Sequence, residues 1–170
     1  MDVLPYINEH KKRFLDELFE VLRIPSVSAD PKFRDNVIEA AEFMKKKLQE
    51  AGADHVTLIE TEGFPVVYGD KIIDPALPTV LVYGHYDVQP AEPLELWHSP
   101  PFEPTQRDGK LYGRGVADNK GNLMLRIQAV EAWLATRGDL PMKINFFVEG
   151  EQEIGSVNLD AYCHEYTDLL

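Results

Sequence analysis

Two short, almost continuously apolar segments limit how this chain can fold more than any other feature does. They are residues 79–83 and 143–148. Runs of this kind are typical of strands covered on both faces, so the first predicts a central strand and the second another buried strand. Between them, residues 120–136 carry apolar side chains at helical spacing and stop before Gly138. A helix between two buried strands indicates an α/β fold.

The rest of the chain fits the same class. Gly52 stands where a left-handed cap would end a helix, and the proline-rich residues 89–110 predict a long loop. The other predicted elements are two amphipathic helices (4–22 and 36–51), two strands (56–60 and 65–68) around a turn (61–64), and a last helix with Ser156 as its N-cap that contains Leu159 and Tyr162. We therefore expect one domain, a three-layer α/β sandwich with a mixed, largely parallel sheet.

Composition and charge exclude several classes of function. The chain has 170 residues, of which 44% are hydrophobic, and a net charge of -12. This acidity argues against partners such as nucleic acid or an anionic membrane, which require clustered lysine and arginine. No segment approaches the roughly 20 apolar residues of a membrane span, and no apolar signal segment is present. The single Cys163 cannot form an internal disulfide, so we expect a cytoplasmic protein.

Histidine and acidic residues follow three of the predicted elements. His85 and Asp87 come directly after the first apolar run. A histidine can bind a metal ion through one imidazole nitrogen while a neighbouring carboxylate orients the ring. Alone, such a pair is weak evidence, since a histidine at a strand end is more often structural.

The second and third clusters are acidic. Asp118 lies in the glycine-rich residues 113–121, where a carboxylate could bridge two cations. A phosphate-binding loop is the competing interpretation, but a carboxylate would repel phosphate and the glycine spacing matches no nucleotide motif. Residues 149–156 carry three glutamates, which form either a solvated turn or a cation site. Because open α/β sheets place ligands at strand ends, the three clusters together predict a site for zinc or a related divalent ion.

These clusters resemble the signature of the zinc aminoacylase and carboxypeptidase family of metallopeptidases. The resemblance rests on residues 84–90 (GHYDVQP), 113–121 (GRGVADNKG) and 149–156 (EGEQEIGS), and begins at residues 23–28 (RIPSVS). With Gln89, the first motif resembles the dipeptidase branch, because the deacylase branch more often has valine at that position. The resemblance implies a hydrolase whose two divalent metal ions, zinc or alternatively manganese or cobalt, activate a water molecule against an amide bond.

The same resemblance implies roles for individual residues. His85 binds one metal ion, and Asp87 supports it from behind. Asp118 bridges both ions, and Glu153 binds the second. A cis peptide bond is implied between Asp118 and Asn119. The implied substrate is a dipeptide or short peptide, with an N-acyl amino acid as the alternative, and the full-length enzyme is expected to be a homodimer.

Gln152 departs from the family pattern. It stands where the family has the glutamate that acts as general base in catalysis. A glutamine amide has no useful basicity near neutral pH, so activity should fall by at least the ~10²–10⁴ that such a base supplies. Glu151 is one residue too early to replace it, because on an extended backbone its side chain points the other way. We interpret Gln152 as an introduced inactivating change; a natural non-catalytic metal-binding relative is the alternative.

Length is the second departure. Family members run to several hundred residues and, by the resemblance, supply a further aspartate and histidine ligand beyond residue 170. They also carry a lid and dimerisation domain. We therefore expect residues 1–170 to be the N-terminal part of the catalytic domain, without the lid and the C-terminal catalytic segment. A sheet that lacks its later strands should expose an apolar edge.

Overall fold

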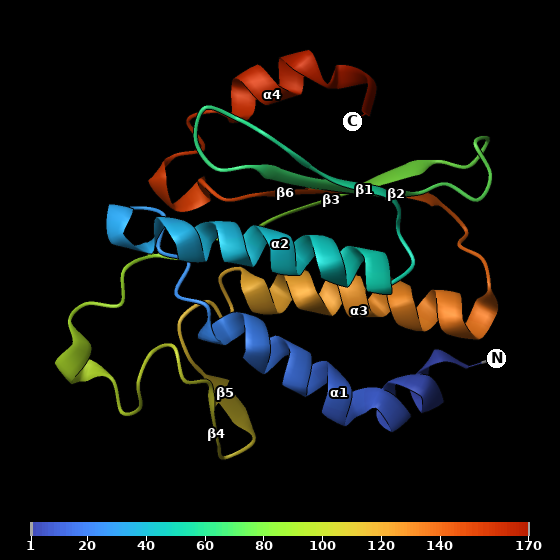
Figure 1. Ribbon diagram of the computed structural model, residues 1–170. Helices are drawn as coiled ribbons and strands as arrows, with labels where there is room; N and C mark the ends of the chain where they lie inside the picture. Colours follow the sequence, from blue (N-terminus) through green and yellow to red (C-terminus); the bar gives the residue numbers. More distant parts are fainter. Residues whose placement is uncertain (1, 170) are drawn as a thin grey trace.

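The computed structural model describes residues 2–169, and Figure 1 shows the arrangement of their helices and strands. The α-helices are α1 (Val3–Arg23), α2 (Arg34–Glu50), α3 (Lys120–Arg137) and α4 (Leu159–Glu165). The strands are β1 (Asp54–Ile59), β2 (Val66–Lys71), β3 (Thr79–His85), β4 (Thr105–Arg107), β5 (Lys110–Tyr112) and β6 (Lys143–Glu149). Every helix and strand expected from the sequence is present. The short hairpin of β4 and β5, at the end of the long loop, was not expected.

The main sheet is mixed, as predicted, with the strand order β1-β2-β6-β3. It is not largely parallel, because among the described strands only β3 and β6 run parallel, while β1–β2 and β2–β6 are antiparallel. The reason is the short connection between β1 and β2, which can only join antiparallel neighbours. Within this turn Thr61 accepts a hydrogen bond from the backbone N–H of Gly63 and donates one to the carbonyl of Phe64.

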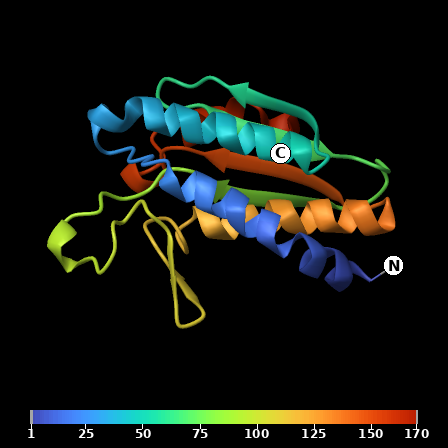
Figure 2. The same cartoon turned by 60° about the horizontal axis from the view of Figure 1, so that its bottom comes forward.

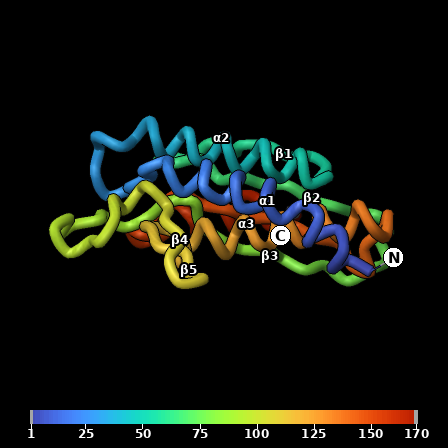
Figure 3. Tube along the Cα trace, turned by 90° about the horizontal axis from the view of Figure 1, so that it is seen from below, coloured from blue at the N-terminus to red at the C-terminus, as the bar shows by residue number. Residues whose placement is uncertain are grey.

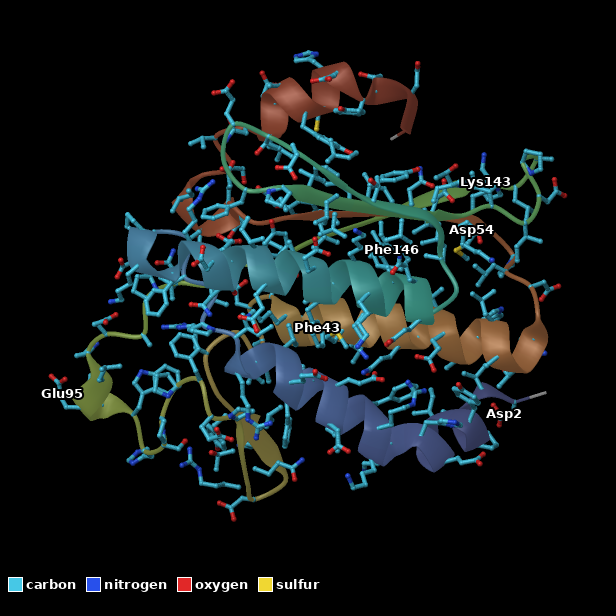
Figure 4. The ribbon with its side chains drawn as sticks, viewed as in Figure 1. Asp2, Phe43, Asp54, Glu95, Lys143 and Phe146 are labelled. Atoms are coloured by element: carbon cyan, nitrogen blue, oxygen red, sulfur yellow. The ribbon has the colours of Figure 1, made fainter. Side chains whose placement is uncertain are left out.

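Helices cover both faces of this sheet, which agrees with the expected layers. In Figure 1, α2 and α3 lie below the sheet and α4 lies above it. The two faces of β6 show why: Phe146 packs with the helices below, whereas Phe147 packs with Tyr162 of α4. Figure 4 labels Phe146 on the underside of the sheet. Burying one such side chain contributes about 1.5–3 kcal/mol, so this alternation fixes the position of β6 between the layers.

The N-terminal helix α1 contacts α3 rather than the sheet, and Figure 3 shows it from the side on which it lies. Arg13 pairs with Glu131 of α3, and Gln128 donates to the carbonyl of Phe14 at 3.0 Å. The last turns of α2 and α3 are followed by Gly52 and Gly138, whose φ angles are +91° and +76°. Both left-handed glycines end helices where the sequence predicts.

The strand β3 differs most from expectation. It was predicted as a central strand covered on both faces, but it lies at the edge of the sheet, and its outer edge pairs with no strand in residues 2–169. Val80, Leu81 and Tyr83 are 42%, 46% and 41% exposed. An apolar run indicates that a strand can be buried, but it does not show how many neighbouring strands there are. In the described part of the chain, β3 has a neighbouring strand on one side only. The expectation of an exposed apolar sheet edge is confirmed.

Ser156 is not the N-cap of the last helix. Helix α4 begins at Leu159 with Asn158 at the N-cap position. Ser156 follows the left-handed Gly155 and itself has a φ of +51°. The chain therefore turns back at this point, and the Ser156 hydroxyl donates to Glu149 at 2.9 Å instead of capping the helix.

The long loop between β3 and β4 extends away from the sheet, as Figure 2 shows, and Figure 4 labels Glu95 near its tip. Trp97 holds the loop together by donating to the carbonyl of Ala91 at 2.8 Å, and the guanidinium of Arg114 lies over its ring. Throughout residues 2–169, no helix combines the length and the apolar character needed to cross a bilayer.

Candidate metal centre

His85 is the last residue of β3 and lies beside Glu149, the last residue of β6. Its side chain is buried, and Nδ1 lies 3.1 Å from the carbonyl oxygen of Asp87. Because a carbonyl only accepts hydrogen bonds, Nδ1 carries the hydrogen, and Nε2 is the nitrogen that can face a cation. Burial lowers the pKa of His85, but its interactions with Asp87 and Asp118 together outweigh this effect and raise the pKa above its ordinary value.

Asp118 reaches His85 from the start of α3. Its Oδ1 lies 3.1 Å from Nε2 of His85, while the side chain as a whole is 73% exposed. The peptide bond between Asp118 and Asn119 is cis, which confirms the prediction. The Asn119 side chain accepts a hydrogen bond from the backbone N–H of His85 at 3.4 Å. The end of β3 and the entrance of α3 are thus joined at this point.

Glu153 completes the group from the 3-10 helix η3 (Gln152–Ile154), which follows β6. One ligand atom each of His85, Asp118 and Glu153 lies within 4.8 Å of the others. One imidazole nitrogen and two carboxylates form a donor set that suits zinc and related divalent ions. The three residues that the sequence predicted as ligands therefore fit a divalent cation.

Asp87 lies behind this group and contacts two of its members. Its carboxylate is fully buried, and Oδ2 accepts hydrogen bonds from the Ser28 hydroxyl at 2.6 Å and from the backbone N–H of Glu153 at 3.0 Å. Oδ1 lies 3.2 Å from Nδ1 of His85 but accepts no well-aligned hydrogen bond. A buried carboxylate in contact with both the imidazole and the Glu153 backbone restrains both groups at once.

The family model for peptidase family M20/M25/M40 matches residues 81–167, which include all three candidate ligands and make up just over half of the chain. The chain belongs to this family. The relatives that it matches within M20/M25/M40 include dipeptidases. Over 98% of its length it is 36% identical to human Beta-Ala-His dipeptidase, and over 91% it is 37% identical to Candida albicans Cys-Gly metallodipeptidase DUG1.

A solved structure supports the same placement within family M20/M25/M40. The chain superposes on human carnosine dipeptidase 1 with a TM-score of 0.90 at 37% identity, covering 98% of this chain and 37% of that one. The alignments cover 35% of both the human and the Candida albicans dipeptidase. The chain therefore spans about a third of the length of the curated relatives it matches.

Within this M20/M25/M40 chain, the two other glutamates of the acidic turn are held by hydrogen bonds from other side chains and from the backbone. Glu149 is buried and accepts hydrogen bonds from the hydroxyls of Tyr83 at 2.5 Å and Ser156 at 2.9 Å. Burial raises the pKa of Glu149 although both hydroxyls favour its charged form. Glu151, also buried, accepts hydrogen bonds from the backbone N–H of Phe64 at 3.1 Å and from the Asn158 side chain.

These contacts separate the roles of the acidic residues. Glu149 and Glu151 fix the turn, and Glu153 alone of the three joins His85 and Asp118. Gln152 opens η3, is exposed, and directly precedes Glu153. Neither a purely solvated acidic turn nor a cation shared by all three glutamates describes this segment.

Sequence reasoning missed two residues that support the site. Ser28 holds Asp87, and the only signal for it was its place at the end of the RIPSVS segment. Lys120 is fully buried at the start of α3 and donates to the carbonyls of Val21 and Ile24 at 3.1 and 2.6 Å. Burial lowers the pKa of Lys120 to about 7. A lysine within a glycine-rich segment looks the same in the sequence whether its amine is buried or exposed.

Proposed function

We propose that this chain contributes the metal-binding part of a dipeptidase, in which divalent ions, zinc first among them, are held by His85, Asp118 and Glu153. One observation carries the proposal: these three side chains converge from three separate segments of a chain that belongs to a peptidase family. The relatives' activity on Beta-Ala-His and Cys-Gly peptides supports dipeptides as the substrate class.

Each residue has a defined task in this proposal. When bound, the ions would polarise the scissile carbonyl and lower the pKa of a water molecule. His85 offers Nε2 because its Nδ1 is directed to the Asp87 carbonyl. The Asp118 side chain is largely exposed, so its carboxylate suits a ligand shared between two ions. Gln152 cannot accept a proton at neutral pH, and we therefore propose that this form is impaired in hydrolysis.

The proposal extends to what lies outside these residues. The chain spans about a third of the length of its relatives, and we propose that the remaining ligands and a lid and dimerisation domain belong to sequence beyond residues 1–170. In that arrangement the working enzyme is a cytoplasmic homodimer. The ions held by this chain alone would then be bound more weakly than those of the complete site.

Zinc binding tests the proposal directly, because it does not depend on Gln152. Competition with a chromophoric chelator measures the affinity of the chain for zinc, and His85→Ala or Glu153→Ala is expected to lower it by more than about 100-fold, beyond the effect of losing a supporting residue. Glu165→Ala, an exposed glutamate on α4, is the control and should leave the affinity unchanged. A parent chain that binds no zinc, or variants that bind as the parent does, would refute the assignment.

The substrate class is tested on a form of the chain extended to the length of its relatives. Beta-Ala-His and Cys-Gly are expected to be hydrolysed faster than an N-acetyl amino acid. Faster release of acetate would instead support the deacylase alternative. Zinc binding without turnover of either class, even with a glutamate at position 152, would identify a non-catalytic metal-binding protein.

A further inference from the structure

Gln89 contacts Glu153 twice, although the two residues lie far apart in the sequence. The Nε2 atom of Gln89 lies 2.8 Å from Oε2 of Glu153 and 3.1 Å from the Glu153 carbonyl oxygen. Both partners are acceptors only, so the NH₂ group of Gln89, and not its oxygen, must face them. The two hydrogens of this group are thus both directed to a single residue.

The backbone that carries Gln89 is itself fixed. The preceding residue, Val88, donates its N–H to the Ser26 carbonyl at 2.9 Å and forms a β-bridge with Val27. Gln89 therefore starts from a restrained position next to the buried Asp87. Its two hydrogen bonds join the side-chain carboxylate of Glu153 to the Glu153 backbone, which restricts the rotation of that side chain.

We propose that Gln89 is a positioning residue that holds the Glu153 carboxylate in place for a divalent cation. Oε2 accepts the bond from Gln89, and the other oxygen of Glu153 stays available to the ion. Asp87 restrains the backbone of Glu153 through its N–H, while Gln89 restrains its side chain. This inference rests on the proposed function, because it assigns Gln89 a role at the same metal site.

If Gln89 had a purely structural role, its removal would lower the stability of the metal-free chain. Gln89 is exposed, and its side chain contacts the short helix η3 rather than the core. Its removal should therefore leave the stability of the metal-free chain unchanged. Supporting residues of metal sites typically change metal affinity by about 10–100-fold when substituted, and we expect a loss in that range.

The test compares Gln89→Leu, which removes both donors, with Gln106→Leu, an exposed glutamine on β4 that serves as the matched control. Zinc affinity is measured by chelator competition, and cobalt is titrated while its visible absorption bands are recorded. Gln89→Leu should bind zinc about 10–100-fold more weakly and change the cobalt bands, with an unchanged Tm of the metal-free chain.

A double-mutant cycle separates this inference from the proposed function. In a Glu153→Ala background, Gln89→Leu should cause no further loss of zinc affinity. If Gln89→Leu binds zinc as the parent does, or if its effect persists without Glu153, the positioning role is wrong while the metal site stands. If the parent binds no zinc, the proposed function fails and the role of Gln89 fails with it.

Discussion

At position 152 the chain carries an amide where a carboxylate would occupy the same space. The residue is exposed at the start of η3, so neither packing nor burial explains why an amide stands there. Its neighbours Glu151 and Glu153 are both engaged, one by Phe64 and Asn158 and the other by Gln89. Within this short helix, position 152 is therefore the one that we propose for the base in proton transfer.

Gln152→Glu is expected to raise dipeptide hydrolysis by at least about 100-fold, because a carboxylate can accept the proton that an amide cannot. Initial rates are measured with saturating zinc on the form extended to the length of its relatives. Gln106→Glu introduces the same charge away from the site and should change nothing. Equal rates for Gln152→Glu and its parent would show that this position does not supply the base.

The individual site residues show how much of the site could be predicted from the sequence alone. His85, Asp118 and Glu153 were predicted from their motifs, and they converge. The different tasks of Glu149 and Glu151 could not be predicted, because three glutamates in one turn look alike in a sequence. Their partners, among them Tyr83 and Phe64, come from other strands and turns, and only the folded chain brings them near.

Among the elements, helices were the most predictable, because their periodicity is local. Gly52 and Gly138 end α2 and α3 with positive φ angles, as expected of left-handed caps. The order of the strands is not local and was not predicted, and the expectation that residues 79–83 form a central strand was wrong. The contact between the end of α1 and the start of α3 was not predicted at all, since it depends on Lys120 entering the interior.

Lys120 makes the link between α1 and α3 sensitive to pH. Burial lowers its pKa to about 7 in the folded chain, whereas an unfolded lysine keeps a value near 10.4. Between these values the unfolded state binds the additional proton, so stability rises with pH. Relative to Lys120→Met, which cannot titrate, the parent should gain on the order of 1 kcal/mol per pH unit between pH 7 and 9.

Urea unfolding of both proteins at several pH values measures this difference. The other titrating groups are common to the two proteins. If the difference does not change with pH, the amine stays charged in the folded chain because the carbonyls of Val21 and Ile24 stabilise it. That result would contradict the prediction.

At the scale of the whole molecule, the outer edge of β3 pairs with no other strand within residues 2–169. Val80, Leu81 and Tyr83 lie along it, and each is more than 40% exposed. Free strand edges with apolar side chains are templates for pairing with another chain. The apolar run was correctly predicted as a strand, but its position at the edge depends on which strands exist elsewhere, and a local pattern carries no such information.

We expect the 170-residue chain to self-associate through this edge, and Leu81→Lys to weaken the association by at least about 10-fold by placing a charge on it. Sedimentation velocity over a range of concentrations measures the effect. Leu96→Lys, at a leucine that is 74% exposed in the long loop, should leave the association unchanged. A parent chain that remains monomeric at high concentration would contradict this prediction.

The three candidate ligands lie at the end of β3, before the start of α3 and after β6, so they belong to segments that are widely separated along the chain. A cation bound by all three would act as a reversible cross-link that closes two large loops. Like a disulfide, such a cross-link lowers the entropy of the unfolded chain, and it does so only while the ion stays bound. The availability of the ion would then set the lifetime of the folded chain as well as its chemistry.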